Sequence, residues 1–71
     1  MSISYKKLFH LMIDQGVSNS ELMKKAQISA NIIPRMKKNG YISLETVEKI
    51  CRAMNCSVDD ILEFVDNEVE I

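Results

Sequence analysis

Apolar residues recur along this 71-residue chain at spacings of three and four, and a serine precedes each run. This spacing places apolar side chains on one face of a helix, and serine is favoured at helix starts. The pattern predicts five short helices joined by tight turns. Their predicted starts are Ser4, Ser18, Ser29, Ser43 and Ser57.

Local signals define where several of these helices begin and end. Ser18 is followed three residues later by Glu21, which is the spacing of a capping box, and Ser57 has Asp60 at the same distance. The first helix is expected to stop at Gly16 and the third before Gly40, because glycine suits the left-handed residue that follows a helix.

The apolar stripes of the five predicted helices give the expected core. Its members are Leu8, Leu11, Met12, Leu22, Met23, Ala26, Ile33, Met36, Leu44, Val47, Ile50, Cys51, Met54, Val58, Ile61, Leu62 and Val65. Only residues 65–71 alternate weakly in the manner of a strand, so an all-α fold is expected.

Composition fits one small helical domain, with two Gly, one Pro, 46% hydrophobic and 27% charged residues. We expect a single domain over 1–71, with a core at about 3–65 and a tail, 66–71, that is disordered or in dimer contact. No apolar run approaches the ~20 residues of a membrane span, and no secretory signal is visible. A cytoplasmic protein is therefore expected.

Few residues suggest catalysis or metal binding. Cys51 and Cys56 are expected to be small buried apolar side chains; a disulfide is less favoured. A zinc site is less favoured still, because four ligands are needed and His10 is the single histidine. There is no nucleophile–base pair and no glycine-rich phosphate loop. We expect no enzyme and no cofactor.

The overall charge of −1 conceals an asymmetry. Residues 1–40 have seven basic and two acidic residues, a net charge of +5. Residues 41–71 have two basic and eight acidic residues, a net charge of −6. The pI of 5.7 argues against nucleic acid, but a basic patch attracts anions whatever the total charge. Charge alone leaves a nucleic-acid partner and a solvated surface both open.

The second and third predicted helices are separated only by "QIS", residues 27–29. Two short helices joined by such a turn make a helix-turn-helix. That packing needs an early leucine, a small residue at the crossing, an apolar turn residue and two inward apolar residues. The chain offers Leu22, Ala26, Ile28, Ile33 and Met36 at these places.

The succession "SNSELMKKAQIS…IIPRMKKNG…ISLETVEKICRAMNCSVDDILE" resembles the XRE (Cro-type, phage-repressor-like) helix-turn-helix family over about residues 3–65. The resemblance implies a compact five-helix, lambda-repressor-like DNA-binding domain with its helix-turn-helix at helices two and three. It implies a sequence-specific transcriptional regulator, a repressor, that reads the major groove of double-stranded DNA with the third helix. It also implies a homodimer.

Carried over position by position, the resemblance places base contacts at the start of the third helix. The candidates are Ala30, Asn31 and Arg35, with Pro34 beside them. Asparagine suits a bidentate contact with adenine, arginine suits one with guanine, and alanine can touch only a thymine methyl. For Asn31 and Arg35 the alternative is an exposed helix surface without a partner.

The resemblance places phosphate contacts at the start of the second helix and just after the third. The candidates are Ser18, Asn19, Ser20, Lys37, Lys38, Asn39 and Tyr41, with Lys6 and Lys7 reaching the flanking backbone. The first amides of a helix suit an anion.

Two residues near the turn depart from the family pattern. Met23 stands where alanine is commonest, so the two helices are expected slightly further apart. Gln27 stands where glycine is usual, and a positive φ there costs Gln on the order of 1 kcal/mol.

Pro34 is the third departure. If Ser29 caps the third helix, Pro34 is its fifth residue and costs a hydrogen bond. If Asn31 is the cap, Pro34 falls in the first turn and is tolerated. We expect an intermediate case, a 3₁₀-like first turn with regular helix from about Ile33. Base readout is then sparse.

Dimerisation and the competing function both draw on the acidic half. A dimer is expected to use the fifth helix and the tail, through Val65, Val69 and Ile71. The alternative function is a protein-interaction module on the same fold, an antitoxin-like or anti-repressor-like subunit whose acidic helices bind a basic partner. The acidic pI and Pro34 favour that alternative.

Overall fold

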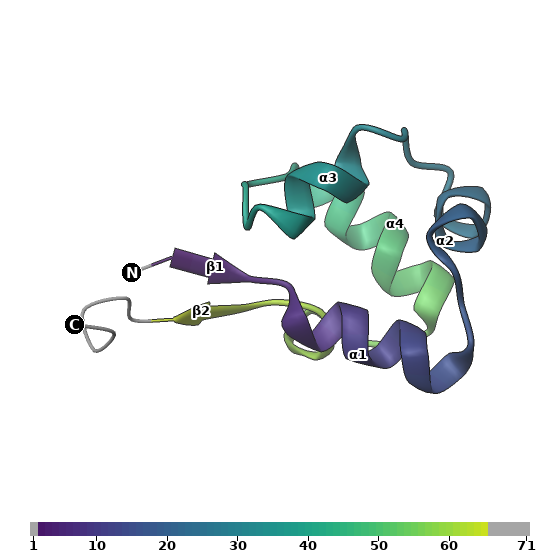
Figure 1. The fold of residues 1–71 in the computed structure, drawn as a ribbon, viewed down its shortest axis with the longest axis horizontal. Helices are drawn as coiled ribbons and strands as arrows, with labels where there is room; N and C mark the ends of the chain where they lie inside the picture. The colour runs from purple at the N-terminus through teal and green to yellow at the C-terminus, as the bar shows by residue number, and fades with distance from the viewer. Residues whose placement is uncertain (1, 66–71) are drawn as a thin grey trace.

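The computed structural model describes residues 2–65, which form four α-helices, one 3₁₀ turn and a two-stranded sheet (Figure 1). In order along the chain these are β1 (Ser2–Ser4), α1 (Lys6–Gln15), α2 (Asn19–Ala26), α3 (Ile32–Lys37), α4 (Leu44–Met54), η1 (Val58–Asp60) and β2 (Glu63–Val65). The first four predicted helices are confirmed, and a small sheet accompanies them.

The expected fifth helix is wrong, because residues 57–65 form one 3₁₀ turn and then a strand. The Ser57 amide does donate to Asp60 Oδ2 at 3.1 Å, so the predicted capping contact is present. The chain then extends, and β2 pairs antiparallel with β1, setting Ile3 opposite Phe64. This long-range pairing replaces the helical bonds beyond Leu62. Val69 and Ile71 lie outside the described residues.

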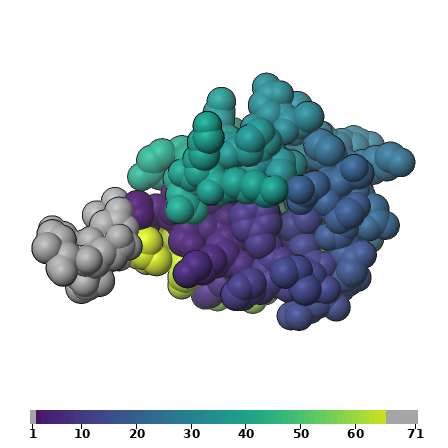
Figure 2. Space-filling view, viewed as in Figure 1, coloured from purple at the N-terminus to yellow at the C-terminus, as the bar shows by residue number. Residues whose placement is uncertain are grey.

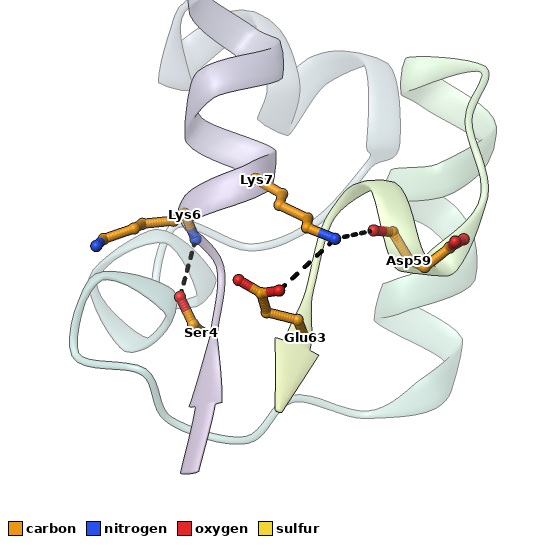
Figure 3. A network of polar contacts seen from close by, with 5 residues as sticks. All are labelled: Ser4, Lys6, Lys7, Asp59 and Glu63. Carbon is orange, nitrogen blue, oxygen red and sulfur yellow. Dashed lines mark hydrogen bonds and ion pairs between the residues drawn. The ribbon is translucent and has the colours of Figure 1, made fainter. Parts of the chain in front are cut away.

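The first helix begins at Lys6 rather than Ser4. Ser4 is the last residue of β1 and is buried. Its hydroxyl accepts a hydrogen bond from the Lys6 amide at 3.3 Å (Figure 3). Serine therefore satisfies the first free amide of α1 from within the strand, and Tyr5 occupies the cap position without a side-chain cap.

Each helix is followed by a residue in the left-handed conformation. These residues are Gly16, Gln27, Asn39 and Asn55. Gln27 has φ 55°, which confirms the positive φ expected of this turn. After α3 the left-handed residue is Asn39 rather than Gly40, and the Gly40 amide donates to the Arg35 carbonyl at 2.8 Å. That bond closes a Schellman motif.

The helices and the sheet enclose one apolar core. Its buried members are Ile3, Tyr5, Leu8, Met12, Leu22, Ala26, Ile33, Met36, Val47, Ile50, Met54 and Ile61. Leu44 and Val58, expected in the core, are instead 85% and 51% exposed. Leu44 is the first residue of α4, and Val58 lies on the outer side of η1.

Within residues 2–65, no three His, Cys, Asp or Glu side chains gather as possible ligands of a metal ion. Cys51 and Cys56 are free thiols that pack against the core but are only half-buried, so the expected burial is partial. Burial raises the pKa of both thiols. His10 is exposed. No helix of the described part is long and apolar enough to cross a bilayer.

Candidate nucleic-acid interface

Helices α2 and α3 pack as a helix-turn-helix at one side of the molecule (Figure 1). Leu22, Ala26, Ile33 and Met36 are buried, and Ile28 in the turn is half-buried against the same core. All five predicted packing positions are therefore confirmed. Figure 2 shows the α3 segment, in teal, forming part of the outer surface.

The N-terminus of α2 is held by the predicted capping box. The Glu21 amide donates to Ser18 Oγ at 3.2 Å, and the Ser18 amide donates to Glu21 Oε1 at 2.9 Å. These bonds from Ser18 lower the pKa of Glu21, with Lys25 and Lys24 adding to the effect. The next two amides, of Asn19 and Ser20, have no partner inside a helix. They are the ones available to an anion.

The start of α3 shows which turn of the helix contains Pro34. A single turn, closed by the Ile32 amide on the Ser29 carbonyl at 3.2 Å, precedes the helix. Regular helix begins at Ile32, one residue earlier than expected, with Asn31 at the cap position. Pro34 is thus the third helical residue, where the missing N–H breaks no helical bond. The expected loosened first turn is confirmed.

The four candidate base-contact residues are all exposed. Ala30 and Asn31 lie in the turn before α3, and Pro34 and Arg35 lie on its outer side, since Ile33 and Met36 take the inner side. Asn31 makes no side-chain cap bond with the helix. The structure therefore presents all four to solvent, and a base-contact role stays a prediction.

The cations of α3 and its C-cap differ from those of α4 in how they are paired. Within residues 2–65, Arg35, Lys37 and Lys38 form no ion pair or side-chain hydrogen bond. By contrast, Arg52 lies 2.8 Å from Glu48 and Lys49 lies 3.9 Å from Glu45. Within the described residues, no carboxylate neutralises the positive charge of α3 and its C-cap.

Lys37 lies beside the N-terminus of α2. It lines the same shallow hollow as Ser18 and Asn19, next to Ile13 of α1. An ammonium group and unpaired helix amides on one hollow suit a phosphate group. Two of the predicted backbone-contact regions, distant in sequence, are therefore brought together.

Lys6 and Lys7 have different surroundings (Figure 3). Lys7 Nζ lies 3.6 Å from Glu63 Oε1 and donates to the Asp59 carbonyl at 3.2 Å, so it ties α1 to η1 and β2. A phosphate would compete with Glu63 for it. Lys6 extends away from this network, and its ammonium forms no ion pair or hydrogen bond within the described residues.

Two residues that support Arg35 could not be found from local sequence patterns. Tyr5 is fully buried, and its hydroxyl donates to the Gly40 carbonyl at 2.5 Å. A Cβ on Gly40 would lie 2.8 Å from Arg35 Cγ, so the stem of Arg35 rests on the glycine. Burial raises the pKa of Tyr5, as does nearby Tyr41. Tyr5 and Gly40 are 35 residues apart, which explains why no motif joins them.

Asn39 and Tyr41, the other backbone candidates after α3, are exposed. Together with Lys38 they follow the helix through the turn that Gly40 and Tyr5 hold. Within that turn, the left-handed Asn39 directs the chain away from α3. The polar side chains of Lys38, Asn39 and Tyr41 are therefore exposed on the segment that follows α3.

Comparison with known proteins agrees with this geometry. The sequence profile of the Cro/C1-type HTH DNA-binding domain matches residues 7–67. The crystal structure of the transcriptional regulator VanUg (form II) is similar, with a TM-score of 0.81 and 34% sequence identity over 87% of this chain and 83% of that one. A search of curated proteins gives no match. The chain belongs to the family of Cro/C1-type helix-turn-helix DNA-binding domains.

Proposed function

We propose that this protein is a sequence-specific transcriptional regulator that acts as a repressor and reads the major groove with α3. The observation that carries the proposal is the unpaired, exposed arginine and lysines on the outer side of a fully packed helix-turn-helix. The family and the similarity to a transcriptional regulator support it.

In this proposal Arg35 is the main base reader, bidentate to guanine O6 and N7. Asn31, free of any cap bond, pairs with an adenine edge. Pro34 and Ala30 add apolar contact with thymine methyl groups. Two hydrogen-bonding readers make a sparse recognition surface, so neighbouring base pairs are expected to contribute through the shape of the DNA.

Backbone contacts fix the register of α3 in the groove. Lys37 and the amide of Asn19 hold one phosphate, because both residues line one hollow. Lys38, Asn39 and Tyr41 follow the strand beyond α3, with Ser18 and Lys6 at the flanks. Each neutralised phosphate contributes about 0.9 to the slope of log affinity against log salt.

Two copies bind two half-sites about one helical turn apart, as palindromic operators require. A repressor then acts by occupying DNA that the transcription machinery needs.

A protein-interaction module is the second candidate, and the net charge of −6 over residues 41–71 favours it. Under this alternative the acidic half binds a basic protein and α3 carries no readout. Affinity for DNA would then be weak and independent of sequence.

Selection of bound duplexes from a random-sequence pool at moderate salt tests the proposal. An enriched palindrome supports a dimeric reader, and its half-site spacing locates the two-fold axis. A single enriched half-site supports base reading by one copy. No enrichment, together with no binding at low salt, contradicts the proposal and favours the interaction module.

A further inference from the structure

The two cysteines of the chain lie together at the end of α4. Cys51 is in the last turn of the helix, and Cys56 follows the left-handed Asn55. The Cys56 amide donates to the Cys51 carbonyl at 3.0 Å, and the Asn55 amide donates to the Arg52 carbonyl at 3.3 Å. These two bonds make a Schellman motif, in which Cys51 and Cys56 take the two positions whose side chains frequently contact each other.

The backbone of this motif brings the two cysteines within reach of a disulfide. The path from one Cα to the other through the 3.0 Å hydrogen bond measures at most about 6.9 Å, and less where it bends. Cysteines whose Cα atoms are more than about 7 Å apart cannot be bridged. A hydrogen bond also joins the two free thiols, so the side chains face each other.

Cys56 is the thiol that a small reagent reaches first. It lines a hollow of about 500 Å³ between α1 and η1, whereas Cys51 does not line it. The charged and titratable residues around Cys56 in this hollow are Lys7, His10, Asp14, Asp59 and Asp60. Both thiols are half-buried. This arrangement makes Cys56 the entry point and Cys51 the second thiol of the pair.

We propose that Cys51 and Cys56 form a reversible oxidation site, at which a small disulfide such as oxidised glutathione converts the two thiols into an intramolecular disulfide. The Cys56 thiolate attacks one sulfur of the small disulfide, breaks its S–S bond and releases one thiol. Cys51 Sγ then attacks Cys56 Sγ and releases the second thiol. The protein gives up two electrons and two protons, and the small disulfide takes them up as its two thiols.

The surroundings of the pair make its oxidation slow but stabilise the product. Burial raises the pKa of both thiols, and the Asp60 carboxylate adds to this effect, so thiolate is scarce at neutral pH. The disulfide would fasten the turn before η1, which packs against α1 and α4, to the end of α4. Closing this six-residue loop constrains the unfolded chain, so the Tm should rise by about 4–8 °C.

Incubation of the full chain with oxidised glutathione at mildly alkaline pH, followed by mass spectrometry without reduction, tests the proposal. The wild type should lose the mass of two hydrogen atoms and both of its free thiols. Dithiothreitol should restore the original mass. Thermal unfolding of the oxidised and reduced forms should then show the higher Tm for the oxidised form.

The single-cysteine variants Cys51→Ser and Cys56→Ser are the matched controls. Cys51→Ser retains the thiol in the hollow but has no second thiol, so it should accumulate as the glutathione adduct. The wild type should contain roughly tenfold less of this adduct, because its second thiol is already in place. Cys56→Ser should react more slowly, since Cys51 does not line the hollow. Circular dichroism of both reduced variants should show the helical content of the wild type.

Several results would overturn the inference. They are a wild type that keeps both thiols, one that stops at a stable glutathione adduct, and a disulfide that joins two copies instead. A lower Tm after oxidation would also overturn it, because the native turn would then not accommodate the bond. The end of α4 lies away from α3 (Figure 1), and the experiment contains no DNA. The inference therefore does not rest on the proposed function, and either can fail alone.

Discussion

Helices α2 and α3 form one motif but are ordered in different ways. α2 has eight residues and a complete capping box at Ser18 and Glu21. α3 has six residues, no side-chain cap at Asn31 and a proline in its first turn. Isolated helices of either length are marginal, but α2 has local signals that α3 lacks.

The difference shows that the proposed reading helix obtains its geometry from its surroundings. Its inner residues Ile33 and Met36 are buried in the core. The turn after it is fixed by Tyr5, whose hydroxyl holds the Gly40 carbonyl. Because core packing and the Tyr5 hydrogen bond fix α3, the helix needs no side-chain cap. The Asn31 side chain therefore makes no cap bond.

Met36→Ala tests this dependence most severely. Met36 is fully buried on the inner side of α3. A buried methionine-to-alanine change costs about 2–5 kcal/mol. The free energy of unfolding, measured in urea, should fall by that amount, and hydrogen exchange should accelerate in α3. Lys38→Ala, an exposed change on the same segment, should stay within about 0.5 kcal/mol of the wild type. Equal effects of the two would refute the dependence on packing.

The caps of the two helices give a sharper comparison. Ser18→Ala should cost about 1 kcal/mol of stability, since it removes the hydroxyl that accepts from the Glu21 amide. Asn31→Ala should change stability by no more than about 0.5 kcal/mol, because Asn31 makes no cap bond. Comparable losses in denaturant titrations would show that α3 is also capped locally.

The pKa of Glu21 gives a second measurement for Ser18→Ala. A backbone and a side-chain hydrogen bond from Ser18 hold this pKa below its usual value. The variant keeps the amide of residue 18, which is the larger cause, and loses the hydroxyl, so NMR titration should show the pKa rising part of the way. A carboxyl group whose pKa is lowered by folding stabilises the fold at pH values above its unfolded-state pKa. That contribution is lost as the pH falls through the lowered, folded-state pKa. The stability difference between wild type and variant should therefore narrow in acid.

Gly40→Ala should act on α3 through Arg35. The added Cβ would lie 2.8 Å from Arg35 Cγ and 3.2 Å from the Arg35 carbonyl oxygen. Moving the side chain off its rotamer costs about 0.5–1.5 kcal/mol, and discrimination at one base position should weaken. Asn39→Gly, in the same turn, is the control and should retain discrimination. If Gly40→Ala left the base preference unchanged, base reading by Arg35 would not depend on the turn at Gly40.

The parts of the fold that sequence predicted are those with local signals. The pairing of Ser18 with Glu21 and the glycine at 16 each act within a few residues, and both were interpreted correctly. Apolar spacing likewise identified the inner sides of α2 and α3. These signals suffice for the helix-turn-helix because its two helices are neighbours along the chain.

What the sequence did not show depends on distant contacts. Ser57 and Asp60 form the contact of a helix start, but pairing of Glu63–Val65 with Ser2–Ser4 ends the helix after one turn. Each strand has three residues, too few for alternation to be recognised. The support of Arg35 by Tyr5 through Gly40 was missed for the same reason. The four candidate base readers lie on the exposed side of their segment, and their contact with bases stays a prediction.

The central claim is that Arg35 reads a base while Lys37 holds a phosphate. Binding of Arg35→Ala and Lys37→Ala to the selected duplex and its single-base variants, over a series of salt concentrations, tests it most directly. Arg35→Ala should lose about 1–3 kcal/mol of discrimination at one base position. Lys37→Ala should weaken binding to every duplex alike and reduce the salt slope by about 1. If Arg35→Ala weakened all duplexes equally and left base preference intact, the account would be wrong.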